Sequence, residues 1–298
     1  MTANFRCLHT LRGHKDIPGF VAIHQERSYL ITNSIDKLIL WDLNSGEQLC
    51  TLAQGGRPVI ISSMVKSSNA PILACDVGNG LIKVWNLDTR KQTLTFRGHA
   101  FQIVGLAITP DGKTLASGSC DHTIKVWNLP KHREMGLVVD PEVNSRSIAI
   151  SPDGQTLAHG SINELKIWDW KTISEIYKID GPLWTYAPVV FSPDGKTITS
   201  ATTDHTIKTW QLSTGQVVQT LNGHTDYVRS LSFSSNGQIL VSGSSDNTIK
   251  VWDMKTHQLI QTLTGHTKTV ADTTISPNGQ TIASISWDGT VRVWGQDP

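Results

Sequence analysis

The sequence contains little that would attach the protein to a membrane or to nucleic acid. No run of 18 uncharged apolar residues occurs in its 298 residues, and the opening MTANFRCLHTLRGH lacks the basic and then apolar stretch of a secretory leader. Its 26 Lys and Arg residues balance 25 Asp and Glu residues, so it lacks the basic excess that phosphate binding requires. We therefore expect a soluble, cytoplasmic protein with no membrane and no nucleic-acid partner.

Cysteine is also scarce, and its placement excludes two further classes of protein. Cys7, Cys50, Cys75 and Cys120 lie in separate segments, without the density of a disulfide scaffold or the paired spacing of a zinc site. None of the 11 histidines forms an HExxH pair or a similar ligand spacing. The sequence predicts no metal site and no cofactor, and a reducing compartment.

A tryptophan repeat dominates what is present. Trp41, Trp85, Trp127, Trp168, Trp210, Trp252 and Trp294 are separated by 44, 42, 41, 42, 42 and 42 residues. Each unit contains short apolar runs separated by clusters of Pro, Asp, Asn and Gly, which is typical of strands joined by hairpins. The sequence thus predicts seven small antiparallel sheets.

The repeats resemble the WD-repeat (beta-transducin-like) family, in which a Gly-His dipeptide is followed by a Ser or Thr, an Asp and a final Trp. The resemblance covers essentially the whole chain, and the regular SPDGKT units look like bacterial, especially cyanobacterial, members. It implies an all-β, seven-bladed β-propeller of four-stranded antiparallel blades. It also implies that the four motif side chains form a hydrogen-bonded structural tetrad in three repeats: His99, Ser117, Asp121 and Trp127; His224, Ser242, Asp246 and Trp252; His266, Ser284, Asp288 and Trp294.

The other four repeats depart from this pattern. The first keeps His14, Thr32, Asp36 and Trp41 but is one residue shorter after Asp36, and the fifth has Pro182 in place of His. The second and fourth have other residues at the His, Ser and Asp positions, which include Cys75 and His159 at the Ser position. We expect the second and fourth blades to lack the tetrad, and blades 2, 4 and 5 to depend more on apolar packing.

The two ends of the chain predict how the propeller closes. Only four residues follow Trp294, so the seventh unit lacks its outermost strand, and the segment 5–11 (FRCLHTL) can supply it. Residues 1–298 are then one WD-repeat domain with no room for a catalytic module.

The resemblance also implies a partner-binding face, which carries the turns between the second and third strand of each blade. Carried over to this sequence, the positions form an arc that is apolar, aromatic and contains one arginine: Tyr227, Arg229, Trp287, Ile17, Ile35, Val59 and Ile61. Trp, Tyr and Arg are enriched in binding hot spots. The alternative is that Ile35, Val59 and Ile61 turn inward and only fill the mouth of the channel.

These observations predict a non-catalytic scaffold that is monomeric on its own and binds a protein or peptide. The sequence contains no pair of residues that can be named as a general acid and a general base, so we expect no catalytic residue. Two alternatives stay open: a small-molecule or glycan sensor that stacks its ligand on Trp287 and Trp184, and an enzyme that uses the central funnel.

Overall fold

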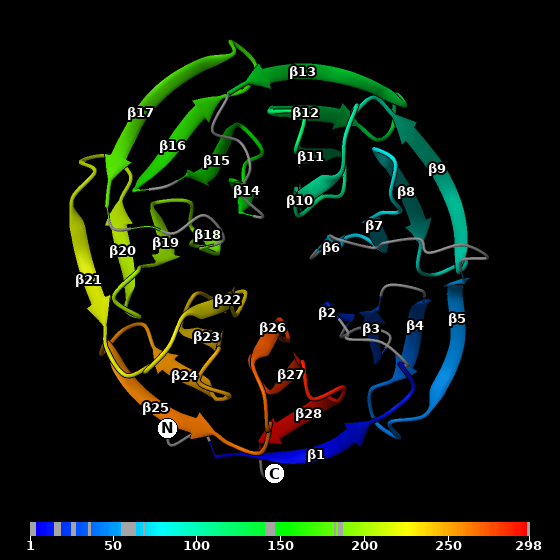
Figure 1. Cartoon of the computed structure of the whole chain (residues 1–298), viewed down its shortest axis with the longest axis vertical. Helices are drawn as coiled ribbons and strands as arrows, with labels where there is room; N and C mark the ends of the chain where they lie inside the picture. Colours follow the sequence, from blue (N-terminus) through cyan, green and yellow to red (C-terminus); the bar gives the residue numbers. More distant parts are fainter. Residues whose placement is uncertain are drawn as a thin grey trace. The chain divides into compact units, whose positions relative to one another are not determined.

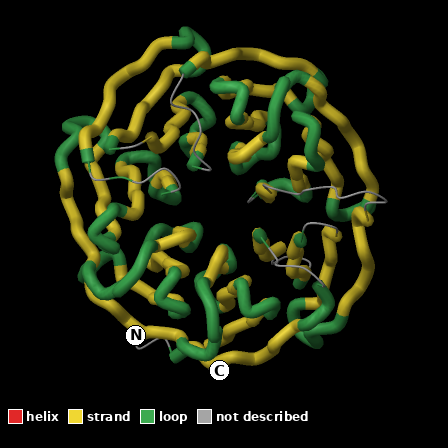
Figure 2. Tube along the Cα trace, in the orientation of Figure 1, coloured by secondary structure: helices red, strands yellow, loops and turns green. Residues whose placement is uncertain are grey.

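The fold was examined in a computed structural model of the chain. The structure describes residues 4–14, 19–24, 28–34, 37–54, 64–67, 69–140, 147–161, 163–181, 183 and 187–296. Within these ranges the chain forms strands and turns and no helix (Figure 2).

The fold class is all-β, with seven four-stranded antiparallel sheets that are the blades of a β-propeller (Figure 1). This confirms the fold predicted from the repeat. The chain divides into two compact units, which we describe separately: residues Met1–Val59, Asp204–Lys208 and Gln219–Pro298, and residues Ile60–Thr203 and Thr209–Val218. That the whole chain is one domain stays a prediction.

The first unit contains blades 1, 6 and 7. Blade 1 consists of β2 (Phe20–His24), β3 (Tyr29–Asn33), β4 (Lys37–Asp42) and β5 (Gln48–Gln54). Blade 6 consists of β22 (Val228–Phe233), β23 (Ile239–Ser244), β24 (Ile249–Asp253) and β25 (Gln258–Leu263). Blade 7 consists of β26 (Val270–Ile275), β27 (Thr281–Ser286), β28 (Val291–Gln296) and β1 (Phe5–Leu11).

The N-terminal strand completes the last blade, as the fold prediction required. β1 pairs antiparallel with β28, from Phe5 opposite Gln296 to Leu11 opposite Val291. The side chain of Gln261 in β25 fixes the start of β1, because its Oε1 accepts from the Phe5 backbone N–H at 2.7 Å and its Nε2 donates to the Phe5 carbonyl at 2.9 Å. Blade 6 therefore holds the strand that closes blade 7.

The second unit contains blades 2, 3 and 4 and part of blade 5, whose β20 and β21 divide between the units. Blade 2 consists of β6 (Met64–Lys66), β7 (Ile72–Asp76), β8 (Leu81–Asn86) and β9 (Lys91–Arg97). Blade 3 consists of β10 (Ile103–Ile108), β11 (Thr114–Ser119), β12 (Thr123–Asn128) and β13 (Arg133–Val139). Blades 4 and 5 consist of β14 (Ile148–Ile150), β15 (Thr156–Ser161), β16 (Glu164–Asp169) and β17 (Ser174–Asp180), and of β18 (Val189–Phe191), β19 (Thr197–Ala201), β20 (Ile207–Gln211) and β21 (Val217–Leu221).

Apolar side chains pack between neighbouring blades within each unit. Ile82 and Val84 of β8 share one buried cluster with Leu106 and Leu115 of the next blade. Inner strands such as β10 are buried along their whole length, whereas the outer strand β9 is mostly exposed and buries only Phe96. This is the pattern expected of a sheet whose outer edge faces solvent.

Candidate functional site

The three complete motifs form the same hydrogen-bonded tetrad. In blade 6 the Trp252 indole N–H donates to Ser242 Oγ at 2.8 Å, and Ser242 Oγ lies 2.8 Å from His224 Nε2. The other ring nitrogen, His224 Nδ1, lies 2.7 Å from Asp246 Oδ2. The corresponding three distances are 2.8, 2.7 and 2.9 Å in blade 3 and 2.9, 2.8 and 2.9 Å in blade 7.

The electrostatics of the tetrad explain its proton arrangement. Burial lowers the pKa of His224, even though the neighbouring Asp246 opposes that change. Burial alone would raise the pKa of Asp246, but hydrogen bonds from His224 and Thr248 hold it well below its usual value. The network thus fits a neutral histidine that donates from Nδ1 to an ionised carboxylate and accepts the Ser242 proton at Nε2. Because both ring nitrogens of His224 are hydrogen-bonded within the tetrad, this histidine has a structural role.

Blade 1 has part of the tetrad in the described residues. His14 Nε2 lies 2.7 Å from Thr32 Oγ1, which accepts the Trp41 indole N–H at 2.7 Å. Asp36 lies outside the described residues. In blade 5 the Ser200 hydroxyl instead donates to the Ala201 carbonyl at 3.4 Å.

Blade 4 has a charged cluster at its motif positions, in addition to the apolar packing expected there. His159, at the serine position, is longer than serine, and its Nε2 lies 3.2 Å from Asp140 Oδ2. The same carboxylate lies 2.9 Å from the Lys166 ammonium, which is 3.1 Å from Glu164 Oε1. Asp140 and His159 are almost completely buried. An ionic cluster therefore replaces the tetrad in this blade.

The described part of the predicted binding arc lies on blades 6 and 7. Trp287 is 43% exposed and Tyr227 is 37% exposed, both high values for large aromatic side chains. The guanidinium carbon of Arg229 lies 5.6 Å from the centre of the Trp287 ring, and Arg229 Nε donates to Ser245 Oγ at 2.9 Å. Arg229 and Trp287 thus come together across two neighbouring blades. Ile17, Ile35, Val59 and Ile61 lie outside the described residues.

Sequence reasoning missed two residues that position this patch. The His205 ring packs edge-on against the Tyr227 ring, with centroids 5.0 Å apart and planes 85° apart. Ser245 holds Arg229 through its side chain, and its backbone N–H donates to the Tyr227 carbonyl at 2.8 Å. Both follow from the repeat, since each lies in a turn between the second and third strands. We name Tyr227, Arg229, Trp287, His205 and Ser245 the aromatic patch.

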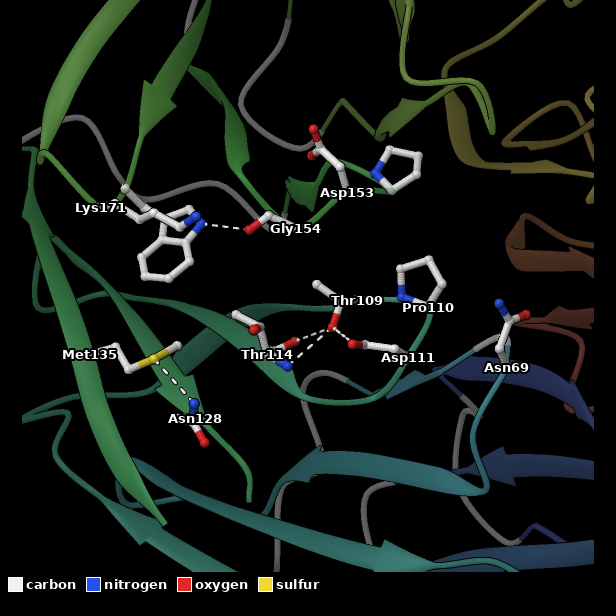
Figure 3. Close-up of a pocket in the computed structure, with 12 residues that line it drawn as sticks. Asn69, Thr109, Pro110, Asp111, Thr114, Asn128, Met135, Asp153, Gly154 and Lys171 are labelled. Atoms are coloured by element: carbon white, nitrogen blue, oxygen red, sulfur yellow. Dashed lines mark hydrogen bonds between the residues drawn. The ribbon is translucent and has the colours of Figure 1, made fainter. Parts of the chain in front are cut away.

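A cavity of about 510 Å³ lies within the second unit, at turns that join first to second strands and third to fourth strands (Figure 3). It is lined by turns of blades 3 and 4 and by Asn69 of blade 2, and its lining includes Trp170, Met135, Asp111 and Asp153. The sensor hypothesis placed a pocket beside Trp287 and Trp184. Trp287 is not among the described residues that line this cavity, and Trp184 lies outside the described residues.

The residues that the structure describes contain neither a cluster of metal ligands nor a membrane-spanning helix. In that part of the chain no three His, Cys, Asp or Glu side chains are grouped closely enough to hold a metal ion. It also contains no helix that could cross a bilayer.

Comparison with protein families gives a repeat match along much of the chain. The model described as "WD domain, G-beta repeat" matches residues 5–42, 90–128, 180–211, 215–253 and 257–295. The ranges it leaves unmatched include β6, β7 and β8 of blade 2 and nearly all of blade 4, the two blades whose motifs depart most from the pattern.

Similar curated proteins come from several eukaryotes. Pre-mRNA-processing factor 19 of Oryza sativa is 25% identical over 119 residues, which are 40% of this chain and 23% of that protein. WD repeat-containing protein SL1-17 of Schistosoma mansoni is 29% identical over 194 residues, 64% of each chain. Small ribosomal subunit protein RACK1 of Caenorhabditis elegans is 31% identical over 121 residues, 37% of this chain and 36% of that protein. The matched segments span less than two thirds of each relative.

Proposed function

We propose, from the premise that this chain belongs to the WD-repeat (G-beta repeat) family, that it is a non-catalytic scaffold whose aromatic patch binds a partner protein or peptide. The family and relatives such as RACK1, named as a ribosomal subunit protein, support a role in protein interaction in general. The patch itself is our own assignment.

The observation that carries the proposal is the exposure of two large aromatic rings beside a stacked arginine. Trp287, Tyr227 and Arg229 are the residue types that dominate binding hot spots, and an exposed aromatic cluster on a protein surface commonly marks an interface. Single exposed apolar residues need no explanation, but here the guanidinium carbon of Arg229 lies 5.6 Å from the centre of the exposed Trp287 ring.

The patch is also held in place before any partner arrives. Arg229 is fixed by Ser245 and Trp287, and the Trp287 backbone N–H donates to the Thr269 carbonyl at 3.0 Å. The His205 ring restrains the Tyr227 ring through the edge-on contact between them. A partner would therefore immobilise few side chains, which reduces the entropy cost of binding.

The non-catalytic part of the proposal rests on the histidines. In the tetrads of blades 3, 6 and 7 both ring nitrogens are occupied by a hydroxyl and a carboxylate. No disulfide joins Cys7, Cys50, Cys75 and Cys120, all of which the structure describes, and this fits the reducing compartment that we propose for the protein.

The test is affinity purification from the native cell with the wild type and the Trp287→Ala/Tyr227→Ala double variant. The matched control is Phe101→Ala, which removes another exposed aromatic ring, from blade 3. We expect one partner to be lost in the double variant and kept in the control, with equal thermal midpoints for all three proteins. Partners that are retained equally by the double variant would refute the assignment of the patch.

A further inference from the structure

The cavity at the turns of blades 3 and 4 is lined by apolar and polar groups side by side. Trp170, Met135, Pro110 and Pro152 contribute apolar surface, whereas Asp111, Asp153 and Asn128 contribute polar groups (Figure 3). Its volume of about 510 Å³ lies within the range of ligand sites, about 300–1,000 Å³. A side chain with an apolar stem and a polar head matches this lining.

The cavity depends on a tryptophan that only this repeat carries at its position. Trp170 follows the Trp168-Asp169 pair, where the other repeats have Leu, Met or, in the seventh repeat, Gln296. The ring is nearly buried, and its N–H donates to the Gly154 carbonyl at 3.0 Å. In β13 of the preceding blade, Gly136 makes room, because a Cβ there would lie 3.1 Å from the Trp170 carbonyl oxygen. The wall is therefore rigid.

Lys171 places a positive charge beside the Trp170 ring. Lys171 Nζ lies 5.8 Å from the centre of the Trp170 ring, within range of a cation–π interaction. The hydrogen bond from Ser151 and, further down in size, the charge of Lys171 hold the pKa of Asp153 below its usual value. Asp153 is thus ionised at neutral pH, and an ammonium beside Trp170 also interacts with this carboxylate.

The same turn holds an exposed isoleucine in an unfavourable backbone conformation. Ile173 has φ +56° and is 52% exposed. The equivalent positions of the other turns between third and fourth strands are glycine, arginine or histidine: Gly46, Arg90, His132, Gly215 and His257. A β-branched side chain is the least suited to this region. An isoleucine kept there at a cost to stability, with half its surface in solvent, indicates that the side chain serves an interaction.

We propose that this end of blades 3 and 4 binds a basic peptide segment. A lysine or arginine side chain of the partner enters the cavity along Trp170 and places its charge beside Asp153, where it displaces Lys171. A neighbouring apolar side chain of the peptide packs on Ile173. We name this surface the basic-peptide site; it shares no residue with the aromatic patch and does not depend on the proposed function.

The probe is a phage-displayed random peptide library selected on the purified full chain, followed by calorimetry with the selected peptides. We expect peptides with Lys or Arg next to an apolar residue. Asp153→Asn should weaken their binding about tenfold, the loss of one charge-assisted contact. This substitution keeps the turn, because Asn236 and Asn278 accept the same serine hydrogen bond at the equivalent positions of blades 6 and 7.

Two further variants separate the site from a folding effect. Ile173→Gly should weaken peptide binding while raising the thermal midpoint, and Lys171→Ala should strengthen binding because it removes the internal competitor. Trp287→Ala should leave this binding unchanged. The proposal is overturned if the selected peptides lack a basic residue. It is also overturned if Lys171→Ala weakens peptide binding more than Asp153→Asn does, or if neither Asp153→Asn nor Ile173→Gly weakens the binding of any selected peptide.

Discussion

A carboxylate on the innermost strand of blade 7 should make the stability of the protein fall as the pH rises. Asp272 Oδ2 accepts from the Val21 backbone N–H of β2 at 2.9 Å, so that it links blade 7 to blade 1 inside the first unit. Asp272 Oδ1 accepts from the Thr273 N–H at 2.9 Å. Burial nevertheless dominates these two bonds and raises the pKa of Asp272 to about 7.

The sign and size of the effect follow from linkage. The unfolded chain releases this proton near its ordinary pKa of 3.8, whereas the folded chain keeps it until about pH 7. Between these values the folded state binds more protons, so its stability falls by about 1.4 kcal/mol per pH unit, or about 4 kcal/mol in total. Asp272 keeps part of its surface in solvent, which stabilises the carboxylate, and we therefore expect about 1–3 kcal/mol.

The measurement is urea unfolding of the wild type and Asp272→Asn at pH 5 and pH 8. Asparagine resembles the protonated acid, with one accepting oxygen, so the two proteins should have similar stability at pH 5. At pH 8 the variant should be more stable by about 1–3 kcal/mol. Asp180→Asn, an exposed carboxylate in β17, controls for the loss of one formal charge. Equal differences at both pH values would refute the reasoning.

Three further changes test other contacts. Ser242→Ala should cost about 1–3 kcal/mol in urea unfolding, because it leaves the Trp252 N–H and the His224 ring nitrogen without their partner, whereas Ser200→Ala should cost under about 1 kcal/mol. Gln261→Ala should speed amide hydrogen exchange in β1 about tenfold, since both bonds to Phe5 are lost; unchanged exchange would show that the β28 pairing alone holds the strand. Ile173→Gly should stabilise the protein by about 0.5–1 kcal/mol, the relief of left-handed strain less the entropy of glycine, and a lower midpoint would contradict the strain.

The repeat made the fold predictable because its signals are local and recur. Short apolar runs between Asp-Gly and Asn-Gly turns define hairpins, and in one of them Gly112 has the positive φ of +69° that such a turn requires. The pairing of β1 with β28 followed from counting strands, since the last unit was one short. Partners for tetrad side chains could be assigned because family resemblance fixes them at constant spacing.

Contacts between side chains far apart in the sequence could not be predicted. The bond from Val21 to Asp272 joins residues 251 positions apart, and no local pattern marks it. Asp140 stands at the glycine position of its repeat, and only the folded blade brings its carboxylate to His159 and Lys166. The packing of His205 against Tyr227 likewise depends on the crossing of turns from adjacent blades.

Residues that depart from the repeat carry information about function that the shared motif does not. Trp170 stands where the other repeats have Leu, Met or Gln, Ile173 stands where they have Gly, Arg or His, and Asp272 stands where blade 6 has Ser230. Each departure is unfavourable for the position by itself, because it adds bulk, backbone strain or a desolvated charge. In a repeat protein the neighbouring units provide an internal reference for what stability alone prefers. A residue that all other repeats avoid at an equivalent position is therefore a better candidate for function than one that they share.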